Sequence, residues 1–342
     1  MPDPFLDDMV RLLDERGCRQ LIAQHLGVAG DGVSVRRLGG GVSNIVFRVD
    51  DGSVGVVVKQ SLDRLRVAAD WHAPQERVLT EYAALTLTHG LTPDQVPTPL
   101  FVDPARFAIG LQAAPEAWRD WKTALLAGHI DVEVAAVLGT QLASWHNGTF
   151  GGVGLGPEFR DPEAFELLRV DPYYRTAARQ LPDLSKPIET LIERMADTQV
   201  CLVHGDFSPK NVLVGPEAGQ CWVIDFEVAH LGDPAFDLAF LLSHLSMKAV
   251  HRPSSAADYD AAARAFVEGY QQAVDAELRP DWSYVLGHTG ALLLARVHGK
   301  SPAEYLDEPQ RRQVHALGES LLTRPATDPD QLATRRDAAA RA

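Results

Sequence analysis

The stretch that decides the fold holds two motifs, VHGDFSPKNVLV at residues 203–214 and VIDFEVAHLGDPAFDLA at residues 223–239. Asp206 and Asn211 lie five residues apart in a loop between β-like runs, and Asp225 closes another such run fourteen residues later. Phosphoryl transfer needs a carboxylate that orients an attacking hydroxyl, and hard oxygen ligands that hold Mg²⁺ against nucleotide phosphates. The spacing indicates Asp206 for the first role and Asn211 and Asp225 for the second. A purely structural role for all three is disfavoured, because unpaired buried carboxylates are costly.

A glycine-rich turn further upstream is a candidate phosphate-binding element. The sequence GGGVSN at residues 39–44 separates two predicted strands. Glycines let backbone N–H groups approach phosphate oxygens without a Cβ atom in the way. The expected contacts are Gly40, Gly41, Ser43 and Asn44. An ordinary hairpin turn is the alternative interpretation.

Lys59 ends the apolar run VGVVVK, so its ammonium group needs a polar partner at the end of a buried strand. A phosphate and a carboxylate from the following helix would meet that need. Glu81 is the expected partner, and Glu76 is its competitor on the same helix. The alternative is an edge-strand lysine that extends its ammonium group to water.

The N-terminal third of the chain is predicted to be rich in β-strands. A helix is expected within residues 5–26, three short strands over residues 33–61, a helix over about 75–90 and two strands over residues 98–112. This order describes a small antiparallel sheet with one packed helix. We therefore expect a nucleotide-binding lobe at residues 1–112.

Helical patterns dominate after residue 112, interrupted by a loop-bearing strand pair around residues 201–228. We expect a helical catalytic and substrate-binding lobe at residues 113–325. The Ala-, Asp- and Arg-rich tail at residues 326–342 is expected to be frayed or disordered.

Composition excludes several classes of protein. The net charge of -14 argues against nucleic-acid binding, and the absence of a long apolar run argues against a membrane span. Three cysteines without a C-x-x-C pair, and an N-terminus unlike a signal peptide, favour a reducing cytoplasm. The acidic excess either keeps the protein soluble or favours a cationic substrate.

The motifs HGDFSPKN and GDPAFDLA, with the strand lysine, resemble those of the aminoglycoside phosphotransferase family. This family has the protein-kinase-like fold and includes choline, homoserine and methylthioribose kinases. The resemblance runs from about residue 39 to residue 246. It implies an α+β, bilobal protein-kinase-like fold, with a small β-rich N-lobe that carries one packed helix and a larger, mainly helical C-lobe.

The resemblance also implies roles for individual residues. Asp206 matches the catalytic aspartate, and Asn211 and Asp225 match the metal ligands. Lys59 matches the lysine that reaches the α- and β-phosphates. Asp237 matches the acid that braces the catalytic loop through backbone N–H groups.

Three neighbouring features remain open at this point. His204 is expected to hold the loop rather than to take part in the chemistry. Glu227 of Asp225-Phe226-Glu227 replaces the glycine of protein kinases; it gives the metal an extra carboxylate, as in methylthioribose kinases, or pairs with a nearby base. Those kinases usually lack asparagine at the position of Asn211, and the glycine turn is shorter than G-x-G-x-x-G.

In this fold the nucleotide base lies in the cleft between the lobes and contacts the connecting segment. Backbone contacts are therefore expected at Gln112 and Ala114. For the acceptor, Tyr173 and Arg296 are candidate contacts in the helical lobe. Arg296 lies in a mostly apolar helix, so a structural role, capping the helix end or pairing with an internal acid, is the alternative.

Together these features predict an ATP- and Mg²⁺-dependent phosphotransferase acting on a hydroxyl of a small molecule such as a sugar, an aminoglycoside or an amino alcohol. The alternative is a non-catalytic nucleotide-binding regulatory protein, a pseudokinase. A protein kinase is disfavoured, because H-R-D and A-P-E motifs are absent and only about eleven residues separate Asp225 from Phe236.

Overall fold

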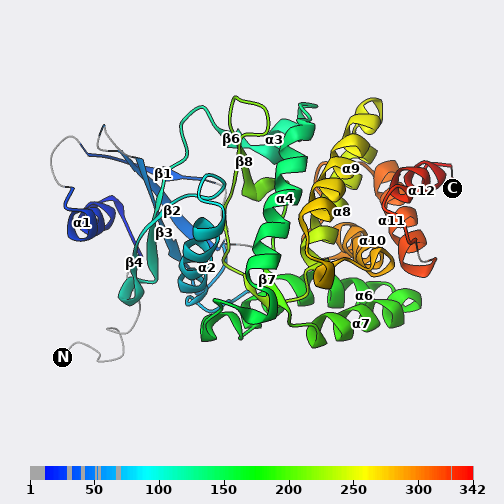
Figure 1. Ribbon diagram of the computed structural model, residues 1–342, viewed down its shortest axis with the longest axis horizontal. Coiled ribbons are helices and arrows are strands. Elements are labelled where there is room, and N and C mark those ends of the chain that lie inside the picture. Colours follow the sequence, from blue (N-terminus) through cyan, green and yellow to red (C-terminus); the bar gives the residue numbers. More distant parts are fainter. Residues whose placement is uncertain are drawn as a thin grey trace. The chain divides into compact units, whose positions relative to one another are not determined.

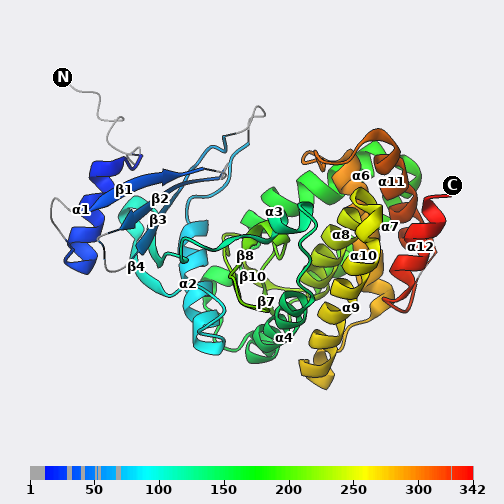
Figure 2. The same cartoon turned by 90° about the horizontal axis from the view of Figure 1, so that it is seen from above.

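The computed structural model describes residues 12–28, 33–39, 43–50, 52, 55–66, 71–324 and 326–341. The chain divides into two compact units, Met1–Pro115 and Glu116–Ala342. The boundary lies three residues beyond the one expected after residue 112. Figures 1 and 2 show the elements of both units from two directions.

The first unit is built on a five-stranded antiparallel sheet in the order β1-β2-β3-β5-β4. One helix precedes the sheet and another interrupts its strands. The elements are α1 (Glu15–Leu26), β1 (Ser34–Leu38), β2 (Asn44–Asp50), β3 (Gly55–Ser61), α2 (Arg77–Leu91), β4 (Pro99–Asp103) and β5 (Ala108–Gln112).

Strand alternation separates the two faces of this sheet. Phe47, Val58 and the α1 residue Leu21 belong to one buried apolar cluster, so this face packs against α1. Lys59 follows Val58 along β3 and therefore lies on the opposite face. The helix α2, which contacts β3, β4 and β5, packs there. The alternation thus directs the one lysine of this strand toward α2.

The second unit is mainly helical and contains two small antiparallel sheets, β7 with β10 and β6-β8-β9. Its strands are β6 (Arg119–Asp120), β7 (Cys201–Val203), β8 (Val212–Val214), β9 (Cys221–Val223) and β10 (His230–Gly232). Its helices are α3 (Trp121–Leu126), α4 (Val132–Gly148), α5 (Glu163–Phe165), a π-helix (Glu166–Arg175), α6 (Thr176–Gln180), α7 (Pro182–Asp197), α8 (Ala235–His251), α9 (Ala256–Ala273), α10 (Trp282–His298), α11 (Glu308–Thr323) and α12 (Gln331–Ala339). The expected α+β fold is confirmed.

The helices α4 and α9 lie side by side (Figures 1 and 2). A Cβ atom at Gly139 of α4 would clash with the carbonyl oxygen of Phe266 in α9, so this close approach requires glycine. Just beyond α4, the hydroxyl of Thr149 accepts a hydrogen bond from the Leu202 N–H at 2.9 Å. The α4–α9 pair therefore supports β7, the strand that leads into the HGD loop, residues 204–211.

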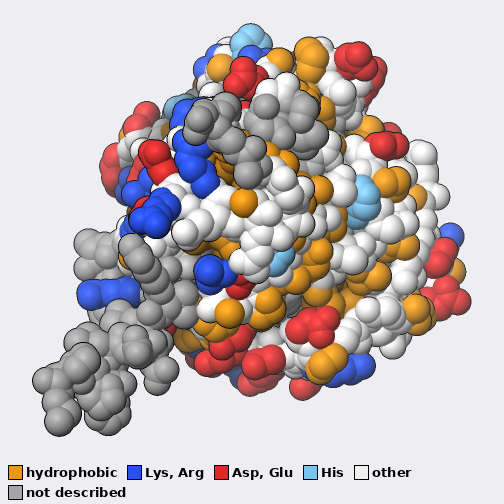
Figure 3. Space-filling model, turned by 90° about the vertical axis from the view of Figure 1, so that its left-hand side faces the viewer, with side chains coloured by type: hydrophobic (Ala, Val, Ile, Leu, Met, Phe, Trp, Pro, Cys, Tyr) orange, Lys and Arg blue, Asp and Glu red, His pale blue; other side chains and the backbone are white. Residues whose placement is uncertain are grey.

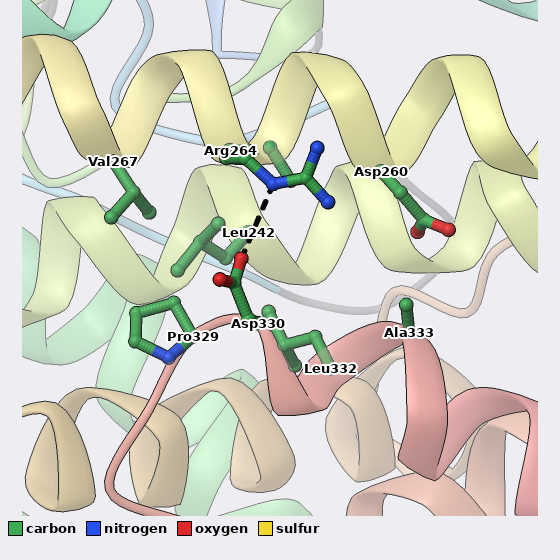
Figure 4. A pocket seen from close by; sticks show the side chains of 9 residues that line it. Leu242, Asp260, Arg264, Val267, Pro329, Asp330, Leu332 and Ala333 are labelled. Atoms are coloured by element: carbon green, nitrogen blue, oxygen red, sulfur yellow. Dashed lines mark hydrogen bonds and ion pairs between the residues drawn. The ribbon is translucent and has the colours of Figure 1, made fainter.

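The tail at residues 326–342, expected to be frayed or disordered, instead contains the helix α12. Leu332 and Arg336 are buried, and Arg264 of α9 pairs with Asp330 at 3.3 Å (Figure 4). The alanines and arginines that suggested disorder also favour helix, and Leu332 gives the helix an apolar contact. The pocket drawn in Figure 4 measures about 30 Å³, which holds water but no larger ligand.

Other global properties follow from the described residues. None of their helices is long and apolar enough to cross a bilayer. Cys18, Cys201 and Cys221 are free and buried, and burial raises the pKa of the Cys18 and Cys221 thiols to about 12. On the face shown in Figure 3, charged side chains of both signs are scattered among hydrophobic ones.

Candidate active site

The Lys59–Glu81 pair is the central feature of the first unit. Lys59 Nζ lies 2.6 Å from Glu81 Oε2, and the two side chains are only 9% and 1% exposed. Glu76 is exposed at the N-terminus of α2. Of the two acids that the sequence left open, the structure therefore pairs Lys59 with Glu81. A buried lysine held in this way presents a fixed positive charge.

The end of the glycine-rich turn is anchored to the same helix. Gly40 and Gly41 lie outside the described residues, whereas Ser43 and Asn44 are buried, and Asn44 Nδ2 donates to Ser43 Oγ at 2.9 Å. Arg77 of α2, which the sequence reasoning missed, donates to the Ser43 carbonyl at 2.5 Å. The helix that carries Glu81 therefore also fixes the start of β2.

The segment after β5 has a defined backbone pattern. The Gln112 N–H donates to the Thr98 carbonyl at 2.8 Å, and the Ala114 carbonyl accepts from Arg48 at 2.7 Å. A base bound at this segment, as the sequence predicts, would therefore contact the Gln112 carbonyl and the Ala114 N–H. One acceptor and one donor two residues apart suit the adenine edge, which presents an amino group beside a ring nitrogen.

In the second unit, Asp237 of α8 holds the HGD loop in place through its carboxylate. Its carboxylate accepts from the His204 N–H at 2.7 Å and from the Gly205 N–H at 2.9 Å. Gly205 has φ 75°, and a Cβ atom there would lie 2.8 Å from the Val228 carbonyl oxygen. The glycine is therefore needed for the turn that brings both N–H groups onto one carboxylate.

His204 is held as a neutral ring. Its Nδ1 accepts from the Asp206 N–H at 3.1 Å, and its Nε2 lies 3.2 Å from the Ile224 carbonyl. These partners fix the tautomer that carries its proton on Nε2. Burial lowers the pKa of His204, despite opposing effects of Asp237 and Asp206. The ring therefore connects the loop to the end of β9, which agrees with a structural role.

The carboxylate of Asp206 is 2% exposed and is held through one oxygen. Asp206 Oδ2 lies 2.6 Å from Arg169 Nη2 and 2.9 Å from Lys210 Nζ, and it accepts from Asn211 Nδ2 at 2.8 Å. All three donors that the structure describes converge on Oδ2. This arrangement fixes the plane of the carboxylate and leaves Oδ1 as the oxygen for a hydroxyl proton.

The charges around Asp206 favour its ionised form. Burial alone would raise the pKa of this carboxyl, but Arg169 and Lys210 outweigh burial, and the net pKa is lowered. Stability gained from this pairing is present above the unfolded-state pKa and is lost as the pH falls through the lower folded-state value. The carboxylate is therefore ionised, and able to accept a proton, at neutral pH.

Arg169 is the main site residue that the sequence reasoning missed. It lies in the π-helix, where its Nε donates to the Gly205 carbonyl at 3.0 Å while Nη2 holds Asp206. The available signal was an arginine inside the apolar run LLRV at residues 167–170, which needs a buried acceptor. Spacing alone could not identify that acceptor, because Asp206 lies far along the chain.

The three proposed metal ligands offer hard oxygen atoms. Asn211 Nδ2 donates to the carbonyl and to the carboxylate of Asp206, so its oxygen Oδ1 is the atom available to a cation. Asp225 is partly exposed, and Glu227 is buried beside Arg169, on whose pKa it acts.

A metal ion here would need more than these side chains. Among the described residues, no three His, Cys, Asp or Glu side chains are grouped to hold one ion. Mg²⁺ is commonly bound by one or two carboxylates together with substrate phosphates and water. Asn211 and Asp225 fit that mode. Asp225 also has φ 71°, a strained conformation of the kind that often occurs at functional sites.

The two acceptor candidates lie near each other in the second unit. Tyr173 is buried in the π-helix, and the guanidinium carbon of Arg296, in the last turn of α10, lies 5.9 Å from its ring centre. Arg296 donates to the hydroxyl of Ser301 at 2.9 Å rather than to an acid. Of the two structural roles that the sequence offered for Arg296, pairing with an internal acid is thus not observed among the described residues.

Comparison with known proteins identifies the class to which this fold and these motifs belong. The chain matches the phosphotransferase enzyme family, APH, over residues 34–283. Because this match covers most of the chain, the protein belongs to that family.

Individual relatives are distant. Methylthioribose kinase 1 of rice (Oryza sativa subsp. japonica) is 26% identical over 252 residues, which cover 66% of this chain and 58% of that protein. The 4-hydroxytryptamine kinase of Psilocybe cyanescens is 24% identical over 270 residues, 68% of this chain and 72% of that protein. The chain thus matches little more than half the length of the rice kinase.

Solved structures show the same fold at lower identity. An amicoumacin kinase gives a TM-score of 0.56 at 15% identity and covers 94% of this chain and 97% of its own. A spectinomycin phosphotransferase gives a TM-score of 0.54 at 16% identity and covers 96% of this chain and 99% of its own. Both support the kinase-like fold.

Proposed function

We propose that this protein is an ATP-dependent kinase that phosphorylates a hydroxyl group of a small molecule. The observation that carries the proposal is the buried, ionised carboxylate of Asp206, which its partners among the described residues hold through Oδ2. A general base must keep one oxygen open to the proton that it takes. Asp206, Asn211, Asp225 and Lys59 are all present, so no observation favours a non-catalytic protein.

The reaction is an in-line displacement at the terminal phosphorus of the nucleotide. The acceptor oxygen forms a bond to this phosphorus, the bond to the bridging oxygen breaks, and ADP leaves. The hydroxyl proton passes to Asp206 Oδ1. Asp237 and Arg169 hold the loop and the carboxylate in position, so little reorganisation accompanies transfer.

ATP is the proposed phosphoryl donor. Lys59, fixed by Glu81, supplies a positive charge for the phosphates, and Gln112 and Ala114 offer a matched acceptor and donor to adenine. The amicoumacin kinase structure contains AMP-PNP, and the spectinomycin phosphotransferase structure contains ADP. These ligands support the same nucleotide class here.

Mg²⁺ is the proposed cation, held by Asn211 and Asp225, with Glu227 as a candidate third ligand. It would neutralise negative charge on the phosphates. The cytoplasm is the proposed location, supported by three free, buried cysteines.

The proposal is tested by ADP release in the presence of ATP and Mg²⁺, over a panel of sugars, sugar acids, amino alcohols, aminoglycosides and nucleoside-derived sugars. We expect at least one acceptor to raise ADP release well above the acceptor-free rate, with loss of the signal when EDTA is added. Nucleotide binding without acceptor-dependent release across the whole panel would contradict a kinase and support a regulatory protein.

Replacing Glu81 by Gln is expected to weaken ATP binding about tenfold and to destabilise the protein. The change leaves the buried Lys59 ammonium without its carboxylate, and breaking a buried pair costs about 3–5 kcal/mol. The measurements are the ATP KM and chemical denaturation. Glu76→Gln, an exposed substitution on the same helix, is the matched control. Equal effects of the two substitutions would exclude the Lys59–Glu81 pair from the nucleotide site.

A further inference from the structure

Two cations of the second unit, the buried Lys248 and the partly buried Arg296, have no acidic partner in the part of the chain that the structure describes. Lys248 of α8 is 0% exposed; its Nζ donates to the His244 carbonyl at 3.4 Å and lies 5.7 Å from the Tyr305 ring centre. Arg296 of α10 bonds Ser301, and its buried Nε has no hydrogen-bond partner among these residues. The described residues include no carboxylate that forms an ion pair with either cation.

An unpaired buried cation is costly, and the surroundings of Lys248 increase that cost. Burial, together with the nearby charges of Lys122 of α3 and Arg296, lowers its pKa to about 7. Asp120 acts in the opposite direction. Its carboxylate, however, caps α3, accepting from the N–H and the hydroxyl of Thr123 at 2.8 and 2.7 Å. Lys248 therefore lies among cations, and the carboxylate of Asp120, which opposes them, caps α3 and forms no ion pair with Lys248.

These cations connect to the HGD loop through side-chain contacts. Tyr173 follows Arg169, which holds Asp206, by one turn of the π-helix. The Tyr173 ring lies 6.0 Å from Phe240, and Phe240 lies 5.2 Å from His244, one turn before Lys248 on α8. The cationic region is therefore continuous with the loop that carries Asp206.

The pKa shifts of Tyr173 and His244, which lie near these cations, indicate a positive electrostatic potential. Burial alone would raise the pKa of Tyr173, but Arg296, Arg169 and Lys210 outweigh it and the net pKa falls. The pKa of His244 is lowered well below its usual value by burial, by Lys248 and Arg296, and by Lys210. The potential in this region is therefore positive, although the chain as a whole carries a net charge of -14.

We propose that the acceptor carries, besides its hydroxyl, an anionic group, a carboxylate or a phosphate, that binds Lys248 and Arg296. This inference rests on the proposed kinase function and names its substrate class. Ammonium and guanidinium groups are the usual protein partners of both anions. The buried Lys248 and the partly buried Arg296, neither paired with an acid among the described residues, disfavour a cationic acceptor such as an aminoglycoside, which the acidic composition left open.

The test uses binding without nucleotide, on three open-chain polyols of equal length that differ in charge. Gluconate is anionic, sorbitol neutral and glucamine cationic, and sorbitol 6-phosphate replaces the carboxylate by a phosphate. By calorimetric titration, we expect one of the two anions to bind at least about tenfold more tightly than sorbitol, and glucamine to bind most weakly. Whichever of the two anions binds more tightly shows whether the site prefers a carboxylate or a phosphate. Equal binding of all four compounds, or no binding, would overturn the inference.

Lys248→Met provides the second arm. It should remove the preference for the anion while raising the thermal midpoint of the free protein, because it deletes an unpaired buried cation. Lys186→Met, which removes an exposed lysine from α7, should change neither property. If the Lys248→Met variant kept its preference for the anion, the anion would bind at another site, and the inference would be overturned.

Proton uptake gives a readout that a purely structural lysine would not produce. Because the pKa of Lys248 is about 7, the side chain is largely neutral at pH 8, and an anion bound to it should draw in a proton. The affinity for the anion should then fall by up to about tenfold between pH 8 and pH 9. These binding experiments need no phosphoryl transfer, so the two proposals can fail separately. Binding of the anion without any turnover would contradict only the kinase proposal. Turnover of neutral or cationic acceptors, with none of an anionic one, would contradict only this inference.

Discussion

Asp206→Asn is expected to reduce phosphoryl transfer by about 10²- to 10⁴-fold while leaving nucleotide binding nearly unchanged. The substitution keeps the shape of the side chain but removes the oxygen that accepts the hydroxyl proton. Transfer is measured as ADP release at saturating acceptor, and binding as the thermal shift produced by an ATP analogue with Mg²⁺.

The matched control is Asp183→Asn, which changes an exposed aspartate in the first turn of α7 and should leave both measurements unchanged. A loss of nucleotide binding in Asp206→Asn would indicate a folding defect rather than a catalytic one. Retention of turnover would contradict the assignment of Asp206 as the base.

Arg169→Gln is expected to have the second-largest effect, and to act through Asp206. Arg169 is the strongest of the charges that keep the pKa of the buried Asp206 low, so its removal lets burial raise that pKa. At a given acidic pH, less of the base is then ionised. The acidic limb of the pH profile of kcat/KM should therefore move to higher pH. On that limb, kcat/KM should fall about tenfold for each pH unit by which the limb moves.

Two further variants separate this effect from a general loss of structure. Arg169→Lys keeps the positive charge and should restore the acidic limb, although it loses the fork that also bonds the Gly205 carbonyl. Arg175→Gln removes an arginine that pairs with Glu166 near the surface of the same π-helix, and should leave the profile unchanged. A lower rate in Arg169→Gln with an unchanged profile would refute the electrostatic role.

The local sequence predicted those parts of the molecule whose partners lie nearby along the chain. The succession of strands and helices in the first unit, the loop around Asp206 and the choice of Glu81 follow from alternation and short spacings, because such contacts are formed within one or two elements. Asp237, thirty-one residues beyond Asp206, was predicted only because its motif resembled a known one.

The remaining features depend on distant contacts that no local pattern encodes. Arg169 reaches Asp206 from a π-helix that contains Pro172, and no local pattern places these two distant residues together. Lys248 lies in a helix whose hydrophobic pattern gave no indication that its ammonium would be enclosed. The tail helix forms because Leu332 is buried, although composition alone favoured disorder.

The left-handed backbone of Asp225 restricts how this site can change during evolution. Only glycine, asparagine and aspartate adopt φ near 71° readily, and aspartate codons differ from those of the other two by a single base. Either mutation removes the carboxylate while leaving the turn intact, and glycine even relieves its strain. One nucleotide change could thus convert an enzyme of this kind into a folded protein that binds its ligands without turning them over. In a protein with this backbone, a single base change thus separates catalysis from ligand binding without turnover.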